Sequence, residues 1–216
     1  AKVCQDIDLA SESFGFMDWR DGTVAGVTAR VFRISFTGEL SYEVNVPAHY
    51  GRHVWEQLIE AGAEFNITPY GTETMHVLRA EKGFFIVGQD TDGSMTPADM
   101  NMNWVVGKNK AFSFIGKRSL ERSDSIRENR KQLVGLKTLE PSAVLPEGAQ
   151  IVDDPNQPIP MAMQGHVTSS YYSASLDHSI ALAVVKGGLN RMGDIVYCPA
   201  ADGSSIAAEI VSSVFY

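Results

Sequence analysis

Glu43 is the carboxylate whose position most suggests ligand chemistry. Polar and apolar side chains alternate from residue 41 to residue 46, so Glu43 faces away from Tyr42 and Val44. A carboxylate placed in this way can accept two parallel hydrogen bonds from an N–H beside an NH₂ group, as in a guanidinium or a 2-aminopyrimidinone. The pattern by itself favours a solvated strand glutamate over a ligand.

Two further features could take part in binding. Trp104 follows a turn-rich stretch at residues 88–97, where we expect a loop-to-strand junction. Its ring can stack on a flat heterocycle or cover a small core, and the pattern favours the core. Asp90 and Asp92 have the spacing of a calcium loop, but the later oxygen ligands are missing, so we expect them to stabilise turns.

The sequence does not indicate a metal site, a catalytic nucleophile or a nucleotide-binding site. Cys4 and Cys198 lie far apart without metal-ligand spacing, and we expect two reduced thiols in a cytoplasmic protein. There is no nucleophile elbow, dinucleotide fingerprint or phosphate loop. The five histidines do not cluster, so no metal site is expected; they are His49, His53, His76, His166 and His178.

Composition limits the partners. The chain has 216 residues, of which 44% are hydrophobic and 20% charged, and its net charge of −8 argues against nucleic acid or an anionic membrane surface. No apolar run approaches the roughly 20 residues that span a bilayer, and no secretory signal is visible.

The elements that would position Glu43 are strands and helices. Two alternating runs, 31–36 and 41–46, surround a turn at residues 37–39 and predict an antiparallel pair. A helix is expected over 51–62 with Gly62 as its C-cap, and another over 72–82 with Gly83 just beyond.

The predicted secondary structure changes from mixed helices and strands to strands alone after a polar stretch. Residues 121–131 predict a linker, and the remainder predicts a small β-barrel or sandwich. We therefore expect an α+β portion at 1–120, the linker at 121–131 and an all-β portion at 132–216. The β-rich runs are 132–137, 165–168, 180–185 and 206–214.

Ordered motifs add a resemblance to a known family. The run from Phe36 to Glu43 reads Phe-Thr-Gly-Glu-Leu-Ser-Tyr-Glu. Three other motifs, each of different sequence, follow at 78–83, 88–97 and 165–176, and the last begins with a Gly-x-Val-Thr-Ser motif. Together they resemble the aminomethyltransferase, or glycine-cleavage T-protein, superfamily. Within this superfamily, the sequences at 70–83, 114–120 and 131–136 are most similar to those of the alpha subunits of sarcosine oxidases.

The resemblance implies a fold and a ligand. The fold would be a partial T-protein folate-binding fold, with an antiparallel sheet and helices followed by a C-terminal β-barrel. The ligand would be tetrahydrofolate, with Glu43 on the pterin's amino and N–H edge. Phe36 stands where many relatives have a tyrosine and keeps the stacking surface, and Trp104 would line the same pocket.

Two departures from the family matter. T-proteins carry an arginine at the position of Met75, so that folate contact is missing. The family's catalytic aspartate would lie before the first residue, so we expect a fragment that is inactive alone and has no catalytic residue. The aspartates that lack the family context are Asp6, Asp8, Asp18 and Asp21.

The resemblance also implies a role. This chain would be the folate-binding portion of a heterotetrameric sarcosine oxidase, which demethylates sarcosine to glycine and forms 5,10-methylenetetrahydrofolate. The intact complex would hold FAD, FMN and NAD and include the other subunits. Alternatives are a T-protein aminomethyltransferase, a dimethylglycine oxidase-type demethylase, and a non-catalytic folate-binding scaffold, which Met75 and Phe36 keep open.

Overall fold

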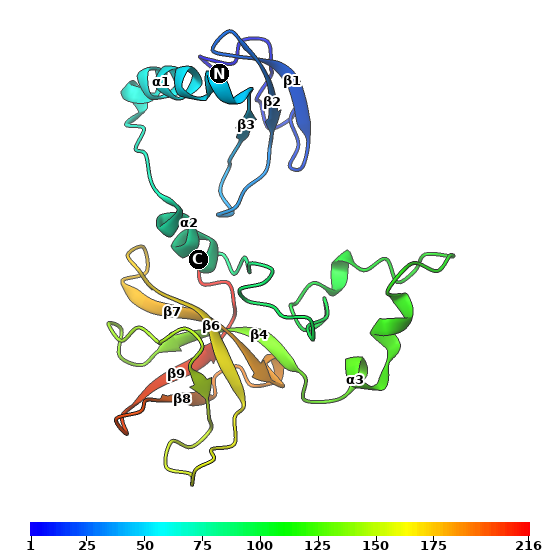
Figure 1. The fold of residues 1–216 in the computed structure, drawn as a ribbon, viewed down its shortest axis with the longest axis vertical. Coiled ribbons are helices and arrows are strands. Elements are labelled where there is room, and N and C mark those ends of the chain that lie inside the picture. The colour runs from blue at the N-terminus through cyan, green and yellow to red at the C-terminus, as the bar shows by residue number, and fades with distance from the viewer. The chain divides into compact units, whose positions relative to one another are not determined.

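The computed structural model describes residues 1–216 as two compact units (Figure 1). The first unit is Ala1–Met75 and the second unit is His76–Tyr216, and each is described by itself. No helix in the chain is both long enough and apolar enough to cross a membrane.

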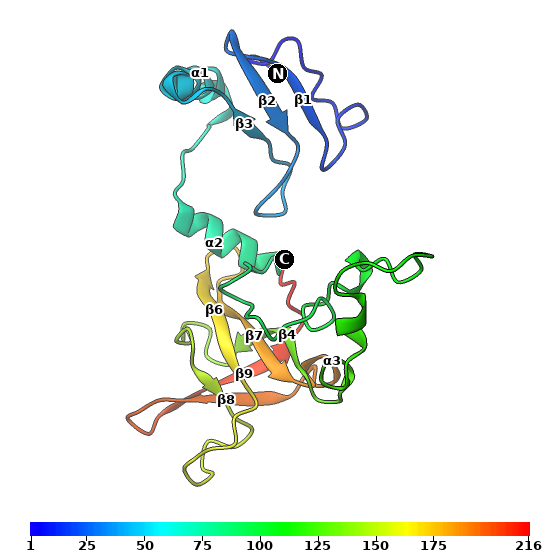
Figure 2. The ribbon, with the colours of Figure 1, turned by 45° about the vertical axis from the view of Figure 1, so that its right-hand side comes forward.

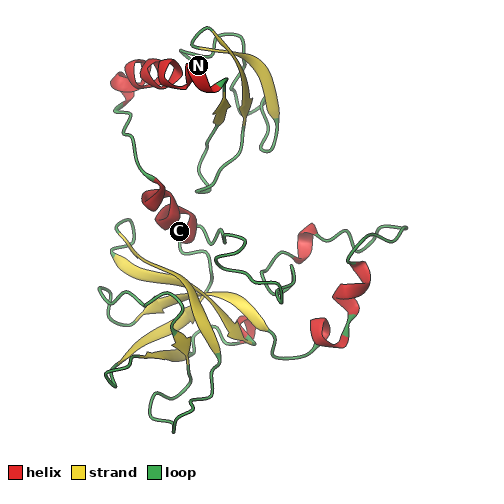
Figure 3. Cartoon of the chain, viewed as in Figure 1, coloured by secondary structure: helices red, strands yellow, loops and turns green.

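The first unit is built on a three-stranded antiparallel sheet in the order β1-β2-β3 (Figure 3). The strands are β1 (Trp19–Val24), β2 (Val27–Phe32) and β3 (Glu43–Asn45). Helix α1 (Gly51–Gly62) contributes Val54 and Leu58 to the apolar core that covers one face of this sheet. The opposite face is left open.

The antiparallel pairing of β2 and β3 is confirmed, but the predicted short turn is wrong. Strand β2 ends at Phe32, and residues 33–42 form a loop in which Gly38 has a φ of +89°. The core face of β2 is Val27, Ala29 and Val31. The apolar alternation that continued through Phe36 therefore does not extend the core.

Both predicted helices are present. Helix α1 has the predicted bounds, but Gly62 stays right-handed, and the helical path continues to Asn66, whose φ of 56° ends it. The C-cap assignment of Gly62 was wrong for this reason. Helix α2 (Thr72–Glu81) ends one residue before the prediction, and Gly83 with φ +70° follows as expected.

The second unit contains a six-stranded antiparallel barrel in the order β5-β6-β7-β4-β9-β8 (Figure 2). Its two edges meet where Val152 and Tyr197 exchange backbone hydrogen bonds of 2.9 Å in both directions. The predicted all-β portion is confirmed. The strands are β4 (Lys131–Thr138), β5 (Gln150–Ile151), β6 (Gly165–Ser173), β7 (His178–Lys186), β8 (Ile195–Pro199) and β9 (Ser205–Val211).

The four predicted β-runs correspond to β4, β6, β7 and β9, whereas β5 and β8 were missed. Inside the barrel, alternate side chains such as Val134, Leu136 and Ile210 form a fully buried core. The remaining helical segments are short: η1 (Ala48–Tyr50), η2 (Ala63–Phe65), η3 (Asn103–Val105), η4 (Lys117–Glu121), α3 (Ser123–Ile126) and η5 (Gly188–Asn190).

Candidate functional site

Glu43 lies on the open face of the first unit's sheet. Tyr42 and Val44 pack into the core on the other face, as the alternation predicted. In the sheet register Trp19 pairs with Phe32, and Phe32 pairs with Glu43. Directly opposed residues in antiparallel strands point to the same face, so these three side chains form one cross-strand row, here called the Glu43 row.

A second row runs beside the first and consists of Asp21, Arg30 and Asn45, in register across the same strands. The Arg30 guanidinium donates two hydrogen bonds to the Asp21 carboxylate, at 2.8 and 3.0 Å. It also lies over the Trp19 ring, 4.2 Å from the centroid. No side chain donates a hydrogen bond to the Glu43 carboxylate, so its acceptor sites are free for a ligand.

The other two predicted ligand residues lie outside regular strands. Phe36 is in the loop that joins β2 to β3, with 45% of its surface exposed. Trp104 is 78% exposed and belongs to the short helical turn η3. No strand follows that turn before Lys131, so the predicted loop-to-strand junction is wrong, and so is the core role that the pattern favoured.

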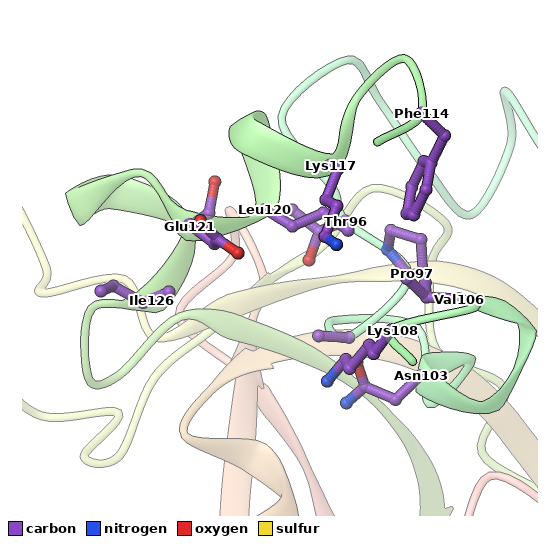
Figure 4. Close-up of a pocket in the computed structure, with 12 residues that line it drawn as sticks. Thr96, Pro97, Asn103, Val106, Lys108, Phe114, Lys117, Leu120, Glu121 and Ile126 are labelled. Atoms are coloured by element: carbon purple, nitrogen blue, oxygen red, sulfur yellow. The ribbon is translucent and has the colours of Figure 1, made fainter. Parts of the chain in front are cut away.

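A cavity of about 390 Å³ lies in the second unit, between residues 96–98 and the segment 103–126 (Figure 4). Most of its lining is apolar. Lys108 and Lys117 are its two cationic side chains, and neither forms an ion pair. Figure 4 shows Lys117 extending into this space from η4. Trp104 does not line the cavity.

The sequence patterns missed a buried ion pair in the second unit. Arg79 on α2 and Asp90 in the following loop are both fully buried, and an Arg79 Nη donates to the Asp90 carboxylate at 2.6 Å. The backbone N–H of Ile86 donates to the same carboxylate at 2.8 Å. Asp90 was predicted to stabilise a turn, which this last bond does, but its larger role is to neutralise a buried cation.

A β-bulge brings two hydroxyl groups to the same carboxylate. The register of β6 against β7 shifts between Val167 and Ser169, so Thr168 is the extra residue. Thr168 and Ser169 each donate a hydrogen bond of 2.6 Å to Asp90. An Arg79 Nη also donates to Ser169 at 2.7 Å. The Gly-x-Val-Thr-Ser motif therefore ties the barrel to α2.

A second charged anchor holds the loop that ends in Thr96-Pro97. Arg130 donates to both oxygens of the Asp99 carboxylate, at 2.6 and 2.8 Å. The Thr96 backbone and hydroxyl each add a hydrogen bond of 2.8 Å. Burial alone would raise the pKa of Asp99, but the bonds from Arg130 and Thr96 outweigh it and hold the pKa below its usual value.

This anchor predicts a pH-dependent stability. A lowered folded-state pKa contributes stability that is present above the unfolded pKa of about 3.9 and is lost as the pH falls through the folded pKa. We expect Asp99→Asn to cost about 1–3 kcal/mol near neutral pH, since Arg130 loses its bidentate partner but keeps Asp124, and progressively less as the pH falls below about 3.9. Denaturant unfolding of both proteins over this pH range measures the difference.

Asp194→Asn is the matched control, because Asp194 is 53% exposed and its partner Arg191 keeps Asp153. Its cost should stay below about 1 kcal/mol at every pH. A cost of Asp99→Asn that stayed constant down to pH 3 would contradict the assignment.

The structure offers little support for metal or thiol chemistry. No group of three or more His, Cys, Asp or Glu side chains is placed to hold a metal ion. Both cysteines are unpaired and buried, and burial raises the pKa of Cys198 to about 12. A thiol with this pKa stays protonated near neutral pH and is a poor nucleophile.

Two family matches together cover most of the chain. Residues 1–110 match the GCVT N-terminal domain, and residues 131–216 match the glycine cleavage T-protein C-terminal barrel domain. The chain therefore belongs to the glycine cleavage T-protein family. The predicted family and the predicted fold class are both confirmed.

Individual relatives include two kinds of enzyme. Sarcosine oxidase subunit alpha from Corynebacterium sp. (strain U-96) is 47% identical over 100% of this chain and 22% of that protein. An aminomethyltransferase from Halothermothrix orenii is 34% identical over 81% of this chain and 46% of that protein. The chain thus spans about a fifth of the former and about half of the latter.

A solved structure supports the same fold. The crystal structure of the glycine cleavage system aminomethyltransferase T from Bartonella henselae superposes with a TM-score of 0.74 at 25% sequence identity. The match covers 87% of this chain and 50% of that one.

Proposed function

We propose that this chain is the tetrahydrofolate-binding portion of a sarcosine oxidase alpha subunit. Its similarity to such a subunit over the whole chain supports the assignment. The observation that carries it is the Glu43 carboxylate, which stands exposed on an open sheet face without a donor of its own. Such a carboxylate matches the adjacent N–H and NH₂ groups of the pterin's pyrimidinone edge.

The proposal gives each predicted ligand residue a role. Glu43 holds the pterin edge and thereby positions N5 and N10 for the incoming carbon, which is a proximity effect. Phe36 offers an aromatic surface to the pterin, and Trp104 is an exposed ring of the second unit that is available for stacking on folate. Residues 121–131 serve as the linker between the folate-binding portion at 1–120 and the barrel portion at 132–216.

In the intact enzyme, we propose that sarcosine loses a hydride and a proton outside this chain, where a bound flavin would supply the two-electron oxidation. The resulting imine carries the methylene carbon, and N5 and N10 of tetrahydrofolate replace the glycine nitrogen on that carbon. The products are glycine and 5,10-methylenetetrahydrofolate. FAD, FMN and NAD are bound elsewhere in the complex, and the partners of this chain are the other subunits.

Glu43→Gln tests the ligand assignment directly. The amide keeps the size of the side chain but replaces one acceptor oxygen with a donor, so the side chain can no longer accept two parallel hydrogen bonds from the pterin edge. We expect tetrahydrofolate to bind about 10- to 100-fold more weakly to the intact protein, as for charge-assisted hydrogen bonds. Calorimetry measures the dissociation constant, with Glu147→Gln, an exposed glutamate of the barrel, as control. Equal affinity of wild type and Glu43→Gln would refute the proposal.

A further inference from the structure

The Glu43 row contains two aromatic side chains beside the carboxylate. Phe32 is directly opposite Glu43, and Trp19 is directly opposite Phe32. We propose that Phe32 is the ring on which the flat pyrimidinone half of the pterin stacks, and that Trp19 closes the far end of this subsite. The inference rests on the proposed role of Glu43 and adds the residues that hold the ring's face.

The spacing of the row suits a flat ligand held at one end. Neighbouring strands lie about 4.8 Å apart, and opposed Cβ atoms about 5 Å apart. A ring system that is hydrogen-bonded to Glu43 and parallel to the sheet therefore extends over Phe32 towards Trp19. The carboxylate binds the ring edge and the phenyl group contacts the ring face, so the two contacts do not compete.

Phe32 has no packing role that would account for it. The core of this unit uses the other face of β2, through Val27, Ala29 and Val31, and does not include Phe32. The side chain is only partly buried, on a face that carries mostly charged and polar residues. An aromatic ring there gains contact area when a flat heterocycle covers it.

Trp19 is held in place by its neighbours. The Arg30 guanidinium covers one face of the indole at 4.2 Å, and the Asp21 carboxylate fixes Arg30 through two hydrogen bonds. Asp21 and Arg30 are therefore positioning residues for Trp19. A ring fixed before the ligand arrives loses less conformational freedom on binding.

The open face is hollowed beside Phe32. A wide hollow of about 640 Å³ lies against β2 and β3, and Phe32 is the member of the Glu43 row that lines it, together with polar residues of the second row, Asp21, Arg30 and Asn45. The lining thus combines an aromatic surface with polar groups that can contact the substituents of a bound heterocycle. This combination is typical of sites for small flat ligands.

Phe32→Leu is the test, because it removes the ring while keeping an apolar side chain. In the intact protein we expect tetrahydrofolate to bind about three- to tenfold more weakly, and Phe32→Tyr to bind like wild type. The same factor is expected for 6-methyltetrahydropterin, which contains the ring system without the tail. Calorimetry with both ligands gives these dissociation constants, and thermal unfolding shows whether each variant is folded.

Phe65→Leu is the matched control, since Phe65 is 69% exposed and lies in η2, outside the sheet. Unchanged affinity in Phe32→Leu, alongside a large loss in Glu43→Gln, would overturn the stacking role alone. A Phe32→Tyr variant as weak as Phe32→Leu would also overturn it, because the ring would then not be what matters. No effect of Glu43→Gln would instead remove the proposed function on which the inference rests.

Discussion

Asp90→Ala is expected to destabilise the second unit by about 3–5 kcal/mol, because it leaves the Arg79 guanidinium buried without a counter-charge. Arg79 and Asp90 are both 0% exposed, so water cannot replace the lost partner. The Thr168 and Ser169 hydroxyls lose their acceptor as well. Denaturant unfolding of the wild type and the variant measures the difference.

Two further variants separate this mechanism from a general loss of packing. Asp153→Ala also removes an aspartate from an arginine, but Asp153 is 52% exposed and Arg191 keeps Asp194, so the cost should stay below about 1 kcal/mol. Adding Arg79→Met to Asp90→Ala removes the unpaired cation and should recover part of the lost stability. A double variant no more stable than Asp90→Ala would contradict the buried-charge explanation.

This ion pair also shows what the sequence could not predict. Arg79 reaches Asp90 across 11 residues, but the hydroxyls that complete the cluster come from residues 78 and 79 positions beyond Asp90. Local periodicity contains no information about such distant partners. The Gly-x-Val-Thr-Ser motif was visible, yet the bulge that turns two consecutive hydroxyls towards one carboxylate depends on the register of β6 against β7.

Strong local patterns, by contrast, were sufficient for most elements. Helix α1 was found because its apolar residues recur at helical spacing, and four barrel strands were found from short β-rich runs between Pro- and Gly-rich turns. Strand β5 has only two residues, and β8 has five and ends in Pro199, so neither offers a long pattern. The β-branched and aromatic residues of β8, Ile195 to Tyr197, were the signal that could have revealed it.

The candidate site was predicted in part. Alternation placed Glu43 on the face opposite the core, and the structure confirms this placement. The same reasoning grouped Phe32 with Ile34 and Phe36 as the apolar face of this strand, which is wrong, because Val31 packs into the core and Phe32 lies on the open face. Its pairing with Glu43 depends on how the ten residues of loop 33–42 bring β3 back to β2, which alternation cannot specify.

Gly165→Ala should cost about 3 kcal/mol or more, through steric conflict within the barrel. A Cβ atom at this position would lie 2.1 Å from the Val184 carbonyl oxygen and 2.9 Å from the Val185 Cα. Both contacts are with backbone, so no side-chain rotation can relieve them, and β7 must move away from β6. Gly165 also pairs with Ile151, so the same movement disturbs β5, where the barrel closes.

Gly93→Ala provides the comparison, because nothing lies within 4 Å of its Cβ position and its φ is not positive. Thermal or denaturant unfolding should show a change within about 0.5 kcal/mol for Gly93→Ala, as is usual for surface substitutions. A similarly small change for Gly165→Ala would mean that the barrel tolerates separation of β6 from β7. The large change that we expect would show that this motif glycine is required by the close approach of two strands, independently of any ligand.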